Sequence, residues 1–250
     1  SIEETYGKTR AFLKIQEGCD RFCSYCIIPY TRGPARSRPI NDIISEVKSL
    51  AKNGYKEVVL TGIHVASYGK DLGDIRLIDV IKAINDIDGI HRIRTSSVEP
   101  LIITDDFLSE LKEIDKFCPH FHLSLQSGSD SVLERMNRRY DKAEYKSAVD
   151  KIRKIYPDAA ITTDIIVGFP GESDAEFEET RAYLEDINLY EMHIFKFSPR
   201  EGTKAAAMDN QIKPEIKNHR SEVLIELAEK NKLEFEEKLV GKEVEVLFES

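Results

Sequence analysis

Short β-rich apolar runs alternate with amphipathic helical patterns through most of this 250-residue chain, and that alternation restricts the fold more than any other feature. Repeated β-then-α units build a parallel sheet covered by helices. The runs that qualify as strands are residues 12–16, 57–60, 93–97, 121–125, 160–167 and 192–197. Six strands are too few to close an eight-stranded barrel. We therefore expect an α/β fold, a partial (β/α)6 TIM-like barrel with its site at the carboxyl ends of the strands.

Helix start signals support the helical half of this pattern. Asp141 and Glu144 stand three residues apart, as do Ser173 and Glu176, and this spacing suits a reciprocal cap at a helix start. Pro214 fits the first turn of a long charged helix, because proline lacks the backbone N–H that this position leaves unpaired. These signals predict three helices after residue 140.

The last ten residues differ from the rest of the chain. Apolar and charged residues alternate over 244–248, which predicts a half-buried strand rather than another helix. We expect one core domain over residues 1–240 and, over 241–250, the start of a small carboxyl-terminal β domain.

Three of the four cysteines, Cys19, Cys23 and Cys26, fall within eight residues directly after the first predicted strand. Such clustering in a chain of this size indicates metal binding and a reducing compartment. Structural zinc and ordinary [4Fe–4S] carriers take four protein ligands, whereas a cubane held by three cysteines leaves one iron open for a small molecule. A zinc site remains the alternative and needs a fourth ligand from His64, His122 or Cys118.

Charge and hydropathy narrow the classes of partner. The formal net charge of −9 does not favour a dedicated nucleic-acid-binding domain, so any RNA contact must be local. The longest apolar stretches are strand length, far short of the roughly 20 residues that span a bilayer, and no leader pattern opens the chain. We expect a cytoplasmic protein that does not enter membranes. Two arginine groups could contact RNA: Arg32, Arg36 and Arg38, and Arg135, Arg138 and Arg139.

The spacing Cys19-x3-Cys23-x2-Cys26 after the first strand of a βα array resembles the motif of the radical-SAM superfamily. This resemblance implies a [4Fe–4S] cluster whose open iron binds S-adenosylmethionine. It also implies that an electron from the cluster breaks the sulfonium bond and releases a 5′-deoxyadenosyl radical, which abstracts hydrogen from a substrate. An electron donor such as flavodoxin or ferredoxin is then required.

Other segments resemble the methylthiotransferase branch of that superfamily, and together they cover nearly the whole chain. They are residues 19–33, 37–39, 61–64, 123–129, 135–140 and 167–172. For the methionyl and ribose end of the cofactor, the resemblance implies Gly62, Ile63, Glu99 and Gln126.

For the adenine end of the cofactor, the resemblance implies three further residues. Tyr25 occupies the position before the third cysteine that packs near the adenine. Gly168 lies in the motif after the fifth strand that approaches the ring, and Phe197 could cover it from the sixth strand. A residue of each kind also has ordinary uses in turns and cores.

Within the branch, residues 9–18 and 32–34 look most like enzymes that methylthiolate N6-threonylcarbamoyladenosine at position 37 of tRNA. Enzymes acting on isopentenyladenosine in tRNA, or on a ribosomal-protein aspartate, are the near alternatives, and a non-catalytic, zinc-stabilised RNA-binding module is the alternative of another class. The family pattern also has an amino-terminal domain with a second cluster, which these residues do not contain. The expected macromolecular partner is the anticodon loop of a tRNA.

Overall fold

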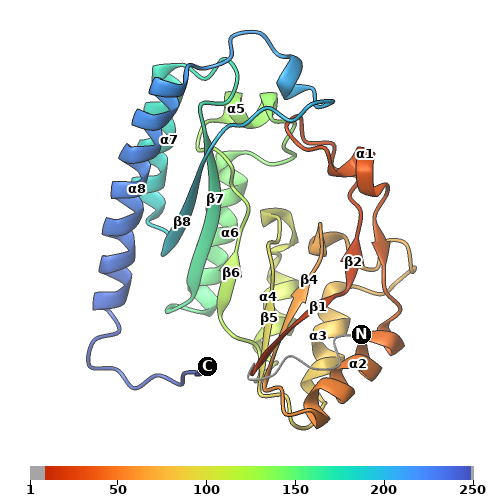
Figure 1. Cartoon of the computed structure of the whole chain (residues 1–250). Helices are drawn as coiled ribbons and strands as arrows, with labels where there is room; N and C mark the ends of the chain where they lie inside the picture. Colours follow the sequence, from red (N-terminus) through yellow and green to blue (C-terminus); the bar gives the residue numbers. More distant parts are fainter. Residues whose placement is uncertain (1–8, 249–250) are drawn as a thin grey trace.

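The computed structural model describes residues 9–248 and confirms six parallel strands in a partial barrel. One sheet has the order β1-β4-β5 and another the order β6-β7-β8. Parallel bridges from Ile93 to Phe117 and from Val98 to Leu123 join β5 to β6, so the strands form one curved array with β1 and β8 at its edges (Figure 1). The strands are β1 (Arg10–Lys14), β4 (Glu57–Thr61), β5 (Arg92–Thr95), β6 (His120–His122), β7 (Ala160–Val167) and β8 (Glu191–Lys196).

The connecting helices begin where the sequence signals place them. Capping boxes at Asp141 and Ser173 start α6 and α7, and Pro214 is the first residue of α8, which packs along β8. The longer helices are α2 (Ile40–Lys52), α3 (Leu77–Asn85), α4 (Asp105–Lys112), α6 (Lys142–Ile155), α7 (Asp174–Ile187) and α8 (Pro214–Glu237). The short segments are α1 (Ile28–Arg32), α5 (Asp130–Arg135), η1 (Val65–Ser67), η2 (Pro100–Ile102) and η3 (Ala205–Ala207). No helix within residues 9–248 is long and apolar enough to cross a membrane.

Each strand turns one row of side chains toward the helices and the other toward the inside of the barrel, because successive side chains alternate across a strand. On the helix side, Leu60, Ile93 and Ile165 are fully buried members of one large aliphatic core. On the inner side of β4, Glu57 is also fully buried, where it pairs with Arg10 of β1 and Arg92 of β5. The inner face of β1, β4 and β5 therefore contains a buried charged cluster.

A two-residue antiparallel ladder that the sequence patterns do not indicate closes the cysteine loop. The strands β2 (Gln16–Glu17) and β3 (Arg36–Ser37) pair with each other, so Gln16 belongs to this ladder and not to the first barrel strand. The cysteine loop is consequently an excursion between two paired strands.

The predicted strand at residues 244–248 is wrong. Residues 242–248 have no regular secondary structure, and Val244, Val246 and Phe248 are exposed. A strand needs a neighbouring strand to satisfy its backbone groups. Within residues 9–248, no strand pairs with this segment; its Phe248 carbonyl accepts a hydrogen bond from the Thr9 hydroxyl at 3.0 Å.

Candidate cluster and cofactor site

The loop that carries the three cysteines is fastened to a distant part of the chain. The Ser24 backbone N–H donates to the Met136 carbonyl at 3.0 Å, and the Ser24 hydroxyl donates to the Arg135 carbonyl at 2.8 Å. The Asn137 side-chain amide donates to the Phe22 carbonyl at 2.9 Å. Loop and helix end therefore meet at one end of the strands, where Figure 1 shows α1 and α5.

Gly18 makes the tight return of this loop possible. Its φ of +73° lies in the left-handed region, and a Cβ there would stand 1.9 Å from the Pro34 carbonyl oxygen. The Cys19 N–H donates to the Gly33 carbonyl at 3.1 Å, which draws the two ends of the loop together. Glycine is thus required at position 18, where the backbone passes close to the Pro34 carbonyl just before the first cysteine.

The three cysteines line one cavity of about 130 Å³ at the carboxyl ends of the strands. Three of the predicted cofactor residues, Tyr25, Ile63 and Glu99, line the same cavity. The other lining residues are Arg21, His64, Ser97, Val98, Ser124 and Arg138. A larger cavity of about 570 Å³ shares Arg21 and Glu99 with it. The sequence pattern thus predicts the cysteines, and among the polar side chains around them it predicts Tyr25 and Glu99 as cofactor contacts.

The spacing of the cysteine sulfurs fits a cluster better than a single ion. The three sulfurs do not form a group in which every donor atom lies within 4.8 Å of the others, although all three residues are described. One tetrahedral zinc with Zn–S bonds of about 2.3 Å requires sulfurs roughly 3.8 Å apart. A cubane spreads its ligands more widely, because each cysteine binds a different iron.

The fourth ligand that zinc would need is poorly placed. Cys118 is buried beyond the opposite end of β6, where burial raises the pKa of its thiol and its charged neighbours are Arg92 and Glu57. His122 lies inside the barrel on β6 and pairs with Asp164. His64 does line the cysteine cavity, but its Nε2 lies 3.1 Å from a Glu99 carboxylate oxygen.

Glu99 is the centre of a buried charged network beside the cysteines. Its carboxylate pairs with Arg21, with His64 and with Arg138, whose Nη2 lies 3.4 Å away. Burial opposes ionisation of this carboxyl, but the hydrogen bond from His64 and the charge of Arg138 outweigh burial and lower the pKa of Glu99 to about 2. A fixed negative charge therefore faces the cavity at neutral pH.

Arg138 takes a different place from the one expected for an RNA contact. Its side chain is 7% exposed, and its Nη1 lies 3.2 Å from the Cys23 sulfur. Its Nε donates to the Tyr140 hydroxyl at 2.9 Å, and the guanidinium lies over the Tyr140 ring. Arg138 therefore belongs to the cysteine site.

The remaining arginines of the two groups divide by exposure. Arg32, Arg36 and Arg139 are exposed on the surface. Arg38 is half-buried and pairs with Glu46 at 2.7 Å, and Arg135 makes a two-pronged pair with Glu176. The exposed three can reach a partner, although Arg32 Nη1 also lies 3.3 Å from a Glu17 carboxylate oxygen, whereas Arg38 and Arg135 are held in ion pairs that are partly buried.

Four predicted cofactor residues lie outside the lining of the cysteine cavity. A Cβ on Gly62 would meet the Gln16 side chain at 2.9 Å, and one on Gly168 would meet Lys217 of α8 at 2.4 Å. Gln126 is buried with φ +75°, and its backbone bridges to β7. Phe197 is buried against Phe169, which in turn contacts Tyr25 edge-on. These four residues therefore lie behind the lining of the cysteine cavity rather than in it.

Arg21, His64 and Arg138 are the polar lining residues that sequence reasoning missed as cofactor contacts. Each stands beside a recognised motif. Arg21 lies between the first two cysteines, His64 follows the second barrel strand, and Arg138 follows α5. Only the fold brings the three to one carboxylate, and no spacing along the sequence encodes that meeting.

Comparison with known proteins places this geometry among relatives. A family model described as the Radical SAM superfamily matches residues 13–184. The tRNA-2-methylthio-N(6)-dimethylallyladenosine synthase of Thermoanaerobacter sp. is 48% identical over 96% of this chain and 51% of its own length. The threonylcarbamoyladenosine tRNA methylthiotransferase MtaB of Thermotoga maritima is 42% identical over 97% of this chain and 56% of its own length. The chain thus spans about half the length of these curated relatives.

Solved structures agree on the fold. The radical S-adenosylmethionine methyltransferase TsrM of Kitasatospora setae, with cobalamin and a [4Fe–4S] cluster bound, superposes with a TM-score of 0.65 at 15% identity, covering 78% of this chain and 38% of its own. Coproporphyrinogen III oxidase (HemN) of Escherichia coli gives 0.62 at 15% identity, covering 90% of this chain and 53% of its own. Since the matched segment covers more than half of the chain and contains the cysteine loop, the end of β1 and the strands β4, β5, β6 and β7, this chain belongs to the radical SAM superfamily.

Proposed function

We propose that this chain is the core of a tRNA methylthiotransferase, with Cys19, Cys23 and Cys26 holding a [4Fe–4S] cluster and S-adenosylmethionine binding beside it. The names of the curated relatives and the sulfur spacing support this assignment. Cluster and S-adenosylmethionine would together supply the hydrogen-abstracting chemistry. The protein's own part is to bind, to orient and to exclude water.

The residues of the cavity suit those tasks. Glu99 is ionised and fixed by three partners, so it can accept hydrogen bonds from a cofactor hydroxyl or ammonium group. Ile63 is 44% exposed at the rim and offers an apolar surface to the cofactor. We assign the adenine side to Tyr25, which is backed by Phe169 and Phe197, and we give Gly62, Gln126 and Gly168 the role of shaping the rim.

We base the choice of substrate on polar side chains of the inner face of the barrel. The named relatives act on two adenosines, one with a dimethylallyl group and one with a threonylcarbamoyl group. The dimethylallyl group is a hydrocarbon, whereas the threonylcarbamoyl group has a carboxylate, a hydroxyl and a urea. Below the cysteine cavity the strands present Arg94, His122 and His193 to the interior. A hydrocarbon would desolvate these groups without replacing their hydrogen bonds, so we assign threonylcarbamoyladenosine.

Two exposed aromatic side chains support entry of a base. Phe12 on β1 is 56% exposed and Phe195 on β8 is 53% exposed, and both strands are edges of the open barrel. Each alternates with residues that face the helices, so each lies on the inner face. Aromatic rings stack with an unpaired base of any identity. We propose that the adenine of an anticodon loop enters between these edges, while Arg32, Arg36 and Arg139 contact its phosphates.

The test compares two RNA hairpins that differ only in the N6 group of the adenosine at position 37. The anaerobically reconstituted chain receives S-adenosylmethionine, a reductant and one hairpin in low salt, and 5′-deoxyadenosine is measured. We expect the threonylcarbamoyl hairpin to raise product formation above the RNA-free rate and the dimethylallyl hairpin to have little effect. Arg94→Leu should remove the difference and keep the RNA-free rate. Preferential stimulation by the dimethylallyl hairpin would reject our substrate assignment.

A further inference from the structure

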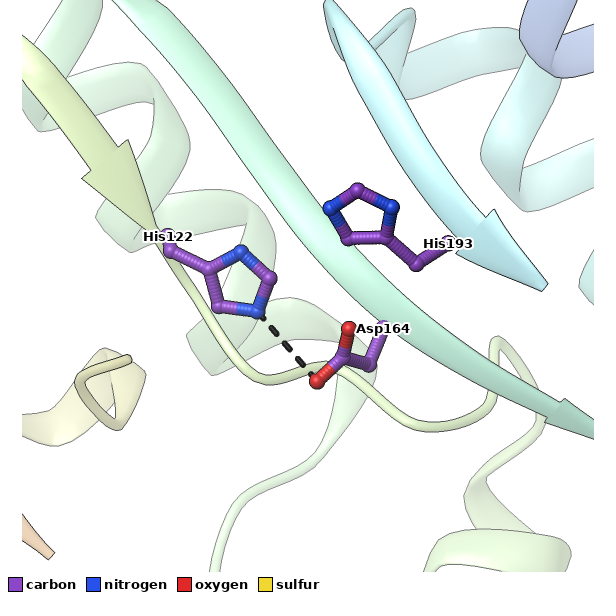
Figure 2. Close-up of side chains that lie close together, drawn as sticks. All are labelled: His122, Asp164 and His193. Carbon is purple, nitrogen blue, oxygen red and sulfur yellow. Dashed lines mark ion pairs between the residues drawn. The ribbon is translucent and has the colours of Figure 1, made fainter. Parts of the chain in front are cut away.

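Three side chains, two of which also belong to the proposed substrate face, meet on the inner face of the barrel. His122 comes from β6, Asp164 from β7 and His193 from β8, and Figure 2 shows the two imidazole rings beside each other with the carboxylate below them. Strand register explains the meeting, because Asp164 is the pairing partner of His193 and His122 pairs with Thr162 two residues earlier. Three neighbouring parallel strands therefore present their side chains at one level.

The distances suit a shared ion. One donor atom from each residue lies within 4.8 Å of the other two, and His122 Nε2 is 3.3 Å from an Asp164 carboxylate oxygen. Metal bonds of about 2.0–2.2 Å to nitrogen and oxygen bring such donors to within roughly 4.4 Å of each other. His193 is exposed, so a small side-chain rotation can close the remaining gap.

A neighbouring hydroxyl fixes the histidine. The Thr162 hydroxyl lies 2.9 Å from His122 Nδ1, on the side of the ring away from Asp164. A partner on one ring nitrogen holds the imidazole in place and leaves the other nitrogen to bind a metal, as in many histidine metal sites. His122 is thus oriented before any ion arrives.

Within the described residues, no lysine or arginine balances the negative charge of the Asp164 carboxylate in this group. Within residues 9–248, no lysine or arginine pairs with Asp164, and His193 makes no hydrogen bond or ion pair, only a stacked contact with the His122 ring at 5.8 Å. Two imidazoles and a carboxylate converge as electron-pair donors. The ion-pair contact between His122 and Asp164 involves two of the three groups and leaves the approach of His193 unexplained.

We propose that His122, Asp164 and His193 bind a divalent transition-metal ion, with zinc as the ion we test. Two histidines and one carboxylate fill one side of a coordination sphere and leave the positions toward the barrel interior open to oxygen ligands. The site is separate from the cysteine loop and does not depend on the proposed reaction.

The experiment counts zinc bound to the reconstituted chain after gel filtration, using elemental analysis for zinc and for iron separately. We expect one zinc per chain in addition to the cluster iron. His193→Gln should weaken zinc binding at least tenfold and leave the iron content unchanged, since His193 is exposed and its loss does not disturb the fold. Thr162→Val should weaken it by about tenfold, the usual cost of losing a partner of a metal-binding histidine.

The matched control is His120→Gln, which changes a histidine on the same strand and face and should keep the zinc. A second experiment measures the absorption bands of bound cobalt, using a variant in which the three clustered cysteines are replaced by alanine. Cobalt bands without any sulfur charge-transfer band are expected, and Asp164→Asn should abolish them. Zinc bound equally well by the parent and by the His193→Gln variant, or no zinc bound at micromolar concentration, would overturn the proposal.

Discussion

The two sides of the same barrel strands differ sharply. On β7 the side chains turned toward the helices include Ile161 and Ile165, which are 1% and 0% exposed and belong to the aliphatic core. The side chains turned inward include Thr162 and Asp164, which contact histidines of β6. One strand thus supports the fold with one row of side chains and presents chemistry with the other. Because the rows alternate, a change in one need not disturb the other.

The largest expected effect comes from the rim of the inner side. Cys23→Ala should abolish the brown colour and the roughly four irons per chain that a three-cysteine cubane requires, while circular dichroism stays close to that of the parent. Cys118→Ala, beyond the opposite end of the barrel, should keep the iron. Iron analysis after anaerobic reconstitution measures both. Equal loss in the two variants would mean that our ligand set is incorrect.

The next prediction compares how much each side of the strands contributes to the free energy of unfolding. Leu60→Ala removes a fully buried side chain from the helix side and should lower the free energy of unfolding by about 3–4 kcal/mol. Asp164→Asn on the inner side should change it by less than about 1 kcal/mol, because the carboxylate is partly exposed and paired only with a histidine. Urea titrations of the two variants compare the costs directly. A greater loss from Asp164→Asn would show that the inner row also carries the fold.

A smaller effect depends on pH. Burial, followed by the charge of Arg94, lowers the pKa of His120 from the usual histidine value of 6.5 to about 4. As the pH falls, His120 takes up a proton in the unfolded chain before it does so in the folded chain. The contribution of His120 to the free energy of unfolding is therefore fully present above pH 6.5 and is lost as the pH falls toward 4. The loss is at most about 3 kcal/mol. Urea titrations at pH 7 and pH 5 should show it in the parent, and His120→Gln should be less sensitive to pH in this range.

The smallest effect concerns the surface. Replacing Arg32, Arg36 and Arg139 by glutamine should leave stability within about 0.5 kcal/mol, since the side chains are exposed. The slope of log affinity for an anticodon hairpin against log salt should fall by about 0.7 per lost phosphate contact. Fluorescence anisotropy at several salt concentrations measures this slope. An unchanged slope would place the RNA on another face.

The fold was largely predictable because it follows local rules. Alternating strand and helix patterns, the caps at Asp141 and Ser173 and the start of α8 at Pro214 all lie within a few residues of their causes. The site was predictable only in part. The cysteines are close together in sequence, but Arg21, His64 and Arg138 come from three separate segments and meet at Glu99, which lies on a fourth. The alternation at 244–248 misled because a strand also needs a partner, which local pattern does not supply.

The paired strands β2 and β3 have a consequence for the life of the enzyme. Their ladder, the Cys19 N–H bond to Gly33 and the bonds of Ser24 to α5 and its end hold the cysteine loop without any help from iron. Iron–sulfur clusters are destroyed by oxygen, and a loop shaped by its metal would collapse with it. Here the protein itself preserves the cradle. If Cys19, Cys23 and Cys26 hold the proposed cluster, a chain that has lost it to oxygen would keep this loop ready for a new cluster without refolding.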